Sequence, residues 1–200
     1  FAVSQNASRF IDDDDIVALD AVVTELSELR RSLHAMHARE AQLLHAGGKI
    51  ADNVLERSNG AAAMPHRSVA AEFGAVLRVS DRAVQRMMSE AEILVTMFPG
   101  VLSSLGAGSI SRGHATVILE AGAHIDDDAA RRVFEATVLE VAERESASRL
   151  RPIAKLLGEK LHPRTLTERH AAAAADRAVR VVDLADGMAD LIATLPATIA

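Results

Sequence analysis

Apolar residues recur every three or four positions along most of this chain, and that spacing places them on one face of an α-helix. The longest such stripe runs from Ile16 to Leu44, after four consecutive aspartates, 12–15, whose carboxylates favour a helix start. Gly47-Gly48 predicts that this helix ends or kinks. Lys49–Arg57 is then expected to form a shorter helix of its own.

The chain keeps this helical period from Pro65 onwards and changes it only near its C-terminal end. The predicted helices are a closely spaced pair between Pro65 and Phe98, then Val101–Leu105, Ser111–Ala121, Ile125–Glu145, Ser146–Leu161 and the Ala-rich Thr165–Arg177. Ala178–Leu184 is rich in valine, and Asp186-Gly187 favours a hairpin turn before a return strand over Met188–Leu195. We therefore predict a mainly α protein, a multi-helix bundle with a helix-turn-helix-like pair and a C-terminal β-hairpin.

Three segments are expected to organise the chain. Residues 1–60 hold the acidic N-terminal segment and the long amphipathic helix, 61–176 form the helical core with the helix-turn-helix-like unit, and 177–200 form the hairpin. A two-stranded hairpin is marginally stable on its own, so we expect it to pack on the helical body or to pair with a C-terminal region outside this chain. The chain begins at Phe1 rather than Met, and we therefore expect it to be part of a longer protein.

Composition indicates a packed helical protein of the cell interior. Apolar residues make up 49% of the chain but aromatic residues only 2%, and a core of alanine, leucine, valine and methionine favours close-packed helices over an aromatic-rich sheet. The chain has no cysteine, which excludes a disulfide framework and a thiolate zinc site and fits the reducing cytoplasm. No apolar run approaches the roughly 18 residues of a membrane span, and the N-terminal segment lacks a signal-peptide pattern. We predict a cytoplasmic protein without a membrane partner.

The net charge of −6 comes from one end of the chain. Residues 1–28 contain seven acidic residues and a single base, Arg9, so the remaining residues are neutral overall. Between Arg144 and Arg169, seven basic residues accompany three acidic ones. Because a charged partner responds to the local field, the acidic whole-chain value does not exclude nucleic acid. The basic stretch is either a phosphate-facing surface or a solvated helix face, and both interpretations stay open.

One segment near the middle of the chain has the features of a helix-turn-helix motif. Gly74 allows the second helix to come close to the first, and Leu77 closes the first helix with an apolar residue. Ser80 belongs to the residue types that cap helix N-termini, and Val84 supplies the apolar contact back to the first helix. Arg78 occupies the turn position where such motifs usually carry glycine.

Arginine and glutamine side chains fall on the side of the second helix opposite Val84, and these residue types can read guanine and adenine edges in the major groove. The predicted DNA-binding residues are Arg82, Gln85 and Arg86 at the bases and Arg67, Arg78 and Ser80 near the phosphate backbone. The same pattern also occurs in Ser-capped helix pairs that never contact DNA, and residues 67–90 carry a net charge of only +1. Both interpretations stay open at this point.

Other polar residues suggest less specific roles. His34 and His37 share a helix face but lack a carboxylate at metal-ligand spacing, so partly exposed helix histidines are favoured over a metal site. His114, at the start of a predicted helix, is expected to pack or to cap that helix rather than to bind an anion. No cofactor, metal or catalytic residue is predicted in this chain.

Several sequence blocks, in their order and spacing, resemble one family. These blocks are Arg67–Glu72 leading into Leu77–Arg86, Ala91–Pro99, Leu105–Ser111 with His114-Ala115, and Asp176–Val181 with Asp186-Gly187-Met188. From about residue 20 to its end the chain resembles the actinobacterial domain of unknown function 222, also called the mycobacterial 13E12 repeat family.

The resemblance implies a DNA-cleavage context, because members of that family typically carry an HNH endonuclease domain, with its divalent metal, after this region. Such a site needs clustered histidine and asparagine, and the asparagines of this chain, Asn6, Asn53 and Asn59, all lie upstream. The leading hypothesis is a non-catalytic DNA-binding or targeting module of an HNH-endonuclease-type protein, the nuclease domain and its metal lying outside this chain. The alternative is a helical oligomerisation or protein-interaction scaffold that uses the helix Ile16–Leu44, as a homo-oligomer or with another protein, and does not contact nucleic acid.

Overall fold

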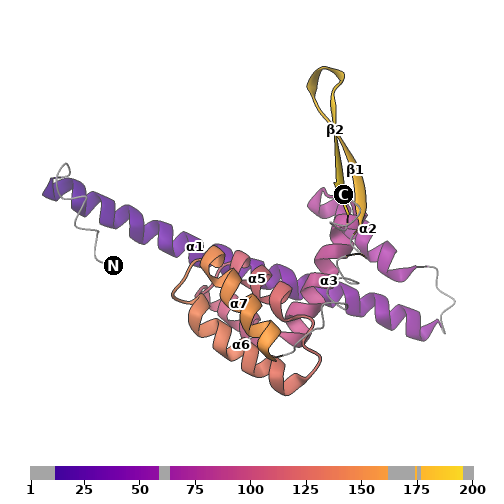
Figure 1. Cartoon of the computed structure of the whole chain (residues 1–200), viewed down its shortest axis with the longest axis horizontal. Helices are drawn as coiled ribbons and strands as arrows, with labels where there is room; N and C mark the ends of the chain where they lie inside the picture. Colours follow the sequence, from indigo (N-terminus) through magenta and orange to yellow (C-terminus); the bar gives the residue numbers. More distant parts are fainter. Residues whose placement is uncertain (1–11, 59–63, 162–173, 175–176, 196–200) are drawn as a thin grey trace. The chain divides into compact units, whose positions relative to one another are not determined.

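The computed structural model describes residues 12–58, 64–161, 174 and 177–195. In these residues the chain forms the helices α1 (Asp13–Arg57), α2 (Pro65–Leu77), α3 (Asp81–Met97), α4 (Pro99–Ala107), α5 (Arg112–Gly122), α6 (Asp128–Ala142) and α7 (Ala147–Leu161), and the strands β1 (Ala178–Asp183) and β2 (Ala189–Thr194), as shown in Figure 1. The predicted mainly α fold with a C-terminal β-hairpin is confirmed. The Ala-rich helix expected over Thr165–Arg177 lies almost entirely outside the described residues.

Contacts divide the chain into two compact units, which meet in the sequence between Leu161 and His162. The first unit holds all of α1–α7 and the second holds β1 and β2. Helix α1 packs on α2, α3 and α4 within the first unit, because its C-terminal half supplies part of their core. The division into three segments with boundaries at residues 60 and 176 stays a prediction.

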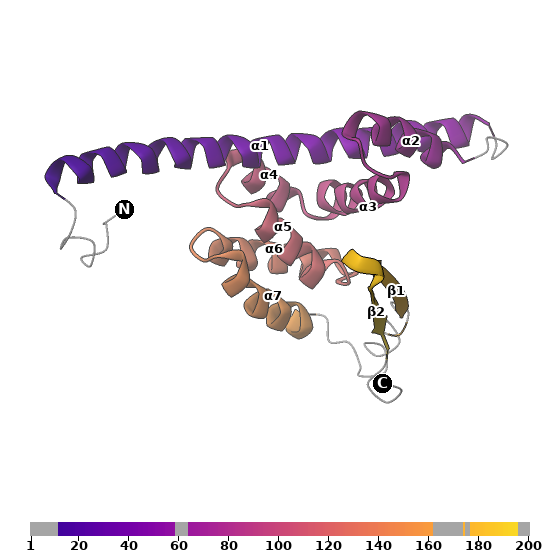
Figure 2. The same cartoon turned by 90° about the horizontal axis from the view of Figure 1, so that it is seen from above.

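Helix α1 is one continuous helix of 45 residues, which can be followed in Figure 2. Asp12 caps its start, where the carboxylate accepts a hydrogen bond from the Asp15 N–H at 2.9 Å. The prediction that Gly47-Gly48 ends or kinks this helix was wrong, and Lys49–Arg57 is the last part of α1 rather than a separate helix.

The reason is a tertiary contact at Gly47. A Cβ atom added there would lie 2.5 Å from the ring of Phe73, so the missing side chain allows this α2 residue to pack directly on the backbone of α1. Glycine lowers helix propensity by about 1 kcal/mol relative to alanine, and packing of this kind overrides that local preference. Glycine at this position therefore indicates a close helix–helix contact instead of a helix end.

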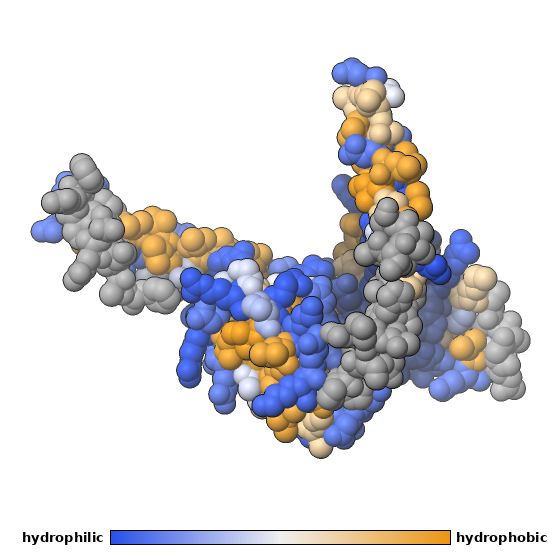
Figure 3. All heavy atoms as spheres, viewed as in Figure 1, coloured by the Kyte–Doolittle hydropathy of each residue, from blue (hydrophilic) through white to orange (hydrophobic). Residues whose placement is uncertain are grey.

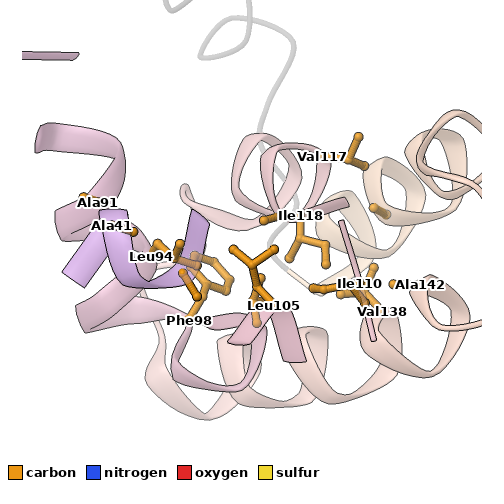
Figure 4. Close-up of a cluster of buried hydrophobic side chains, with 14 of the residues drawn as sticks. Ala41, Ala91, Leu94, Phe98, Leu105, Ile110, Val117, Ile118, Val138 and Ala142 are labelled. Carbon is orange, nitrogen blue, oxygen red and sulfur yellow. The ribbon is translucent and has the colours of Figure 1, made fainter. Parts of the chain in front are cut away.

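One continuous hydrophobic core runs through the helical unit. Phe98, at the junction of α3 and α4, is fully buried and contacts Phe134 of α6 edge-on, with ring centroids 6.4 Å apart. Figure 4 shows Phe98 and Leu105 between Leu94 on one side and Ile118 on the other. Helix α4 thereby joins the α1–α3 layer to the α5–α7 layer.

A buried carboxylate, Glu135 of α6, fixes the start of α4. Its Oε1 atom accepts a hydrogen bond from the Val101 N–H at 2.8 Å, and it thus satisfies a backbone donor that the N-cap residue Phe98 leaves free. Burial raises the pKa of the Glu135 carboxyl, although hydrogen bonds from the Val101 and Gly100 N–H groups act in the opposite direction.

Two helix boundaries differ from the predicted ones because of capping. The expected helix Ile125–Glu145 is shorter, Asp128–Ala142, since the Asp127 carboxylate accepts hydrogen bonds from the Ala129 and Ala130 N–H groups and so begins the helix there. The expected short helix Val101–Leu105 extends to Pro99–Ala107.

The C-terminal hairpin has the predicted strands and turn. β1 and β2 pair antiparallel, with Ala178 opposite Thr194 and Asp183 opposite Ala189. Asp186 and Gly187 both have positive φ, 59° and 74°, as the Asp-Gly signal predicted. In the described part of the chain, no helix is long and apolar enough to cross a membrane.

Candidate nucleic-acid interface

The turn between α2 and α3 depends on close backbone packing at Gly74. The Val79 N–H donates a hydrogen bond to the Gly74 carbonyl at 3.1 Å, and a Cβ atom on Gly74 would lie 2.9 Å from the Val79 carbonyl oxygen. A glycine is therefore needed for the chain to reverse direction here. Between them, Arg78 adopts the left-handed conformation, with φ 56° and ψ 42°.

Helix α3 begins with the predicted serine cap. The Ser80 Oγ atom accepts a hydrogen bond from the Ala83 N–H at 3.3 Å, and its own hydroxyl hydrogen stays available for a second acceptor. Val84 and Met88 are buried residues of α3, and Ala70 and Gly74 are the buried residues of α2. The sequence thus produces the helix–turn–helix pair that it predicts.

The predicted base-reading residues form the exposed face of α3. The side chains of Arg82, Gln85 and Arg86 are all exposed. Neither arginine takes part in an ion pair with any residue that the structure describes. Their guanidinium groups therefore keep their hydrogen-bond donors free for an external acceptor.

The predicted backbone-contacting residues are split between two places. Arg78 and Ser80 lie at the turn, next to Arg82. Arg67 lies near the start of α2, ten residues from Leu77 and hence about 15 Å along the helix from the turn. All of them are exposed, and the Arg67 Nη1 atom has only a weak contact to the Met64 sulfur at 3.9 Å.

A hollow of about 240 Å³ beside Gln85 adds polar residues that sequence reasoning missed. Lys49 of α1 and His66 of α2 line it together with Gln85. Both bind the carboxylate of Asp52, Lys49 Nζ at 3.1 Å and His66 Nε2 at 3.0 Å. The hydrogen bond from Lys49 is the main cause that lowers the pKa of Asp52. No periodicity within one helix could have found this set, because its members come from three helices.

A second hollow, of about 280 Å³, lies between α1, α3 and α5 and is mainly apolar. Its walls include Leu44, Met87, Leu94, Leu105 and Leu119. Such a hollow can hold an apolar group, and the polar residues that line it include His37, Glu40 and Glu90.

The histidines have structural surroundings. His114 caps α5 as expected: its Nδ1 accepts a hydrogen bond from the Ser111 N–H at 3.1 Å, and its Nε2 lies 2.8 Å from the Glu145 carbonyl oxygen. His34 and His37 are half-buried on α1, and burial lowers the pKa of His34, which favours its neutral form.

Metal-binding side chains do not gather in the described residues, where no three His, Asp or Glu side chains could hold an ion together. The divalent metal that the family resemblance implies therefore has no fitting site among the described residues. In the basic stretch, Arg149 pairs with Glu145 at 3.2 Å and Arg151 pairs with Glu120 at 2.5 Å, while residues 162–173 lie outside the described residues.

Comparison with known proteins identifies the family. The family described as Domain of unknown function (DUF222) matches residues 21–200. No curated protein and no solved structure matches the chain. Since the family match covers most of the sequence, this chain belongs to the DUF222 family.

Proposed function

We propose that this chain is a non-catalytic DNA-binding or targeting module. In this proposal α3 enters the major groove, Arg82, Gln85 and Arg86 face the bases, and the turn lies against the phosphate backbone. The observation that carries the proposal is the exposure of Arg82 and Arg86 on the side of α3 opposite its buried residues, without an internal ion pair among the described residues.

The chemistry of these side chains suits the two kinds of contact that such a module needs. Arginine can donate two parallel hydrogen bonds to guanine O6 and N7, and glutamine can pair with adenine N6 and N7. The Ser80 hydroxyl can donate to a phosphate oxygen while its oxygen caps α3. Arg67 and Arg78 would contact the phosphate backbone and fix the position of α3.

The nuclease context of this proposal rests on the family resemblance. An HNH endonuclease domain outside this chain would supply the divalent metal and cleave the DNA, and this module would bring the DNA to it. The module itself would have no catalytic residue. Its binding is therefore measurable without any cleavage assay.

Fluorescence anisotropy with labelled duplex DNA across a salt series tests the proposal. We expect the affinity to fall as the salt concentration rises. A plot of log affinity against log salt concentration should have a slope of about −0.9 for each phosphate contact, because basic side chains that bind phosphates displace the counterions of the DNA. Arg82→Ala and Arg86→Ala should each weaken binding by about 5-fold or more, on the order of 1–3 kcal/mol. Arg67→Ala should weaken binding to all sequences and lower the salt slope by about 1.

Arg132→Ala is the matched control, because Arg132 is an exposed arginine of α6. It should leave the affinity unchanged. Absence of binding at low salt, or equal affinity for wild type, Arg82→Ala and Arg86→Ala, would exclude the proposed recognition face.

A second candidate function, a helical interaction scaffold, is favoured by a different observation. Residues 12–32 of α1 are exposed throughout, although many of them are large and apolar. The buried residues of α1 begin at Ala38, so removing residues 1–30 should keep the core intact while it removes most of this exposed face. If sedimentation shows the same number of chains per particle with and without residues 1–30, the scaffold has no support.

A further inference from the structure

The N-terminal half of α1 presents apolar side chains that no described part of the chain covers. Val22 is 61% exposed, and Leu26 and Leu29 are each 55% exposed. Figures 1 and 2 show this half of α1 extending beyond α2–α7, and Figure 3 shows apolar residues gathered along it. A contiguous apolar surface of this kind is typical of an interaction site.

The exposed side chains follow a seven-residue repeat. One series is Leu19, Leu26 and the half-buried Leu33, and the other, three positions later, is Val22, Leu29, Met36 and Leu43. Alternating steps of three and four residues are the a and d pattern of a coiled coil. We call these two series the stripe. Its exposure in the folded chain distinguishes it from the apolar residues of α1 that face the core.

Where α1 packs on the helical body, the stripe residues Met36 and Leu43 lie on a different side of the helix from the buried residues. Ala38, Ala41 and Leu44 are the buried residues of the middle of α1, whereas Met36 is 57% and Leu43 is 52% exposed. Met36 lies about 200° around the helix axis from Ala38, and Leu26 and Leu29 belong to the half of α1 that extends beyond the helical body. A second helix can therefore lie along the stripe while the body stays packed.

Charge along α1 indicates what this second helix is. Residues 12–28 contain seven acidic residues and no base, whereas Arg30, Arg31 and Arg39 follow within the next turns. Two copies of α1 in parallel would bring the acidic halves together. Two copies in antiparallel orientation would instead set the acidic half of each beside the half of the other that holds Arg30, Arg31 and Arg39 with the single acid Glu40, so the charge of the two halves favours that orientation.

We propose that α1 forms an antiparallel coiled coil with α1 of a second copy of this chain. In the register that keeps both series at the interface, Leu26 lies opposite Leu29 of the second copy, and Leu19 lies opposite Met36. This proposal rests on the second candidate function, the interaction scaffold, and is independent of DNA binding.

Sedimentation across a protein concentration series tests whether the pairing occurs. The wild-type chain should reach twice the monomer mass, and the double variant Leu26→Glu/Leu29→Glu should stay monomeric because it places carboxylates at the centre of the interface. The matched control is Ala21→Glu/Thr24→Glu, which adds the same charge to exposed α1 positions outside the stripe and should still dimerise. All three should have the same helix content, since the substituted residues lie outside the core.

Disulfide cross-linking tests the orientation, and the absence of native cysteine makes it direct. Copies with Leu19→Cys are mixed with differently tagged copies with Met36→Cys under mild oxidation. The antiparallel register predicts that the mixed disulfide dominates, because each cysteine lies about 25 Å from its own counterpart along the helix axis, and a disulfide needs Cα atoms within about 7 Å.

Two results would overturn the proposal in different ways. Dominant Leu19→Cys homodimers would show a parallel pair, which leaves the scaffold function standing and removes the antiparallel register. A monomer at every concentration would remove self-association itself. Neither result affects the anisotropy test, because the DNA-binding variants change α3 and not the stripe.

Discussion

At the scale of single residues, Arg78 shows a conflict between residue type and backbone conformation. Its φ of 56° lies in the left-handed region, where an L-residue costs about 1–2 kcal/mol and glycine is free of that cost. The sequence pattern already placed Arg78 where helix-turn-helix motifs favour glycine. An arginine that is kept in this conformation at an exposed turn is what a phosphate contact would require, as in the proposed function.

We predict that Arg78→Gly raises the free energy of unfolding by about 0.5–1 kcal/mol and weakens DNA binding. The gain is smaller than the relieved strain because glycine gives the unfolded chain more conformational freedom. Urea denaturation measures the first effect and anisotropy the second. As a control, Arg82→Gly lies inside α3 and should lower stability by about 1 kcal/mol. A loss of stability in Arg78→Gly would contradict the strain argument.

The carboxyl group of Glu135 gives a pH-dependent prediction. Burial raises its pKa in the folded protein, so the folded chain takes up this proton at a higher pH than the unfolded chain does. Its contribution to the free energy of unfolding therefore grows as pH falls from the raised folded value towards the ordinary value, and it is lost as pH rises through that window.

Glu135→Gln should remove this dependence, because the amide oxygen can still accept the hydrogen bond from the Val101 N–H. We predict that the melting temperature of the wild type rises relative to that of the variant as the pH falls from neutral to values near the ordinary carboxyl pKa. Differential scanning calorimetry over this range measures it. Two curves that stay parallel would show that the Glu135 proton is not linked to folding.

At the scale of elements, the α2–α3 pair depends on the absence of a side chain at Gly74. We predict that Gly74→Ala lowers the free energy of unfolding by about 1–2 kcal/mol, since the added methyl would displace the turn backbone at Val79, and this outweighs the better helix propensity of alanine. Chemical denaturation followed by circular dichroism measures the change.

Gly48→Ala is the matched control, because a Cβ there would meet only the end of Met88 at 3.8 Å. It should raise stability by about 0.5–1 kcal/mol through helix propensity alone. If both substitutions act in the same direction, the close approach at Gly74 does not limit the turn.

These two glycines also show how far sequence patterns reach. Gly74 was recognised because its role is fixed by residues close in sequence, the turn and Ser80. Gly47 was misread as a helix end because its role is set by Phe73, which is far away along the chain. Patterns within one helix likewise predicted that Arg82 and Arg86 lie on the exposed side of α3, but could not find Lys49 and His66, whose positions beside Gln85 depend on how α1, α2 and α3 pack.

At the scale of the whole molecule, the apolar face of α1 is buried in one half of the helix and exposed in the other. Periodicity identified the stripe from Ile16 to Leu44, but periodicity is equal for a face that meets its own core and one that meets a partner. Only the fold separates them, with Ala41 and Leu44 buried and Leu26 and Leu29 exposed. The function of the N-terminal half of α1 therefore depends on which partner covers its apolar side chains.

The boundary after Leu161 separates the helical unit from the unit that holds the hairpin. Among the described residues, the buried core runs from Ala38 to Ala154 and lies entirely before residue 162, whereas both strands of the hairpin are almost entirely exposed, with Val181 66% and Leu191 71% exposed. An isolated two-stranded hairpin without a covered apolar face is marginally stable in water. A chain ending at Leu161 should therefore keep the cooperative unfolding transition and helical circular dichroism of the full chain, while a peptide of residues 162–200 should show no cooperative transition.

The chain that ends at Leu161 should also keep the full DNA affinity, because the proposed recognition residues all lie before residue 87. Loss of cooperative unfolding in the shortened chain would show that the hairpin segment completes the core, and loss of binding with folding intact would place part of the DNA interface after Leu161.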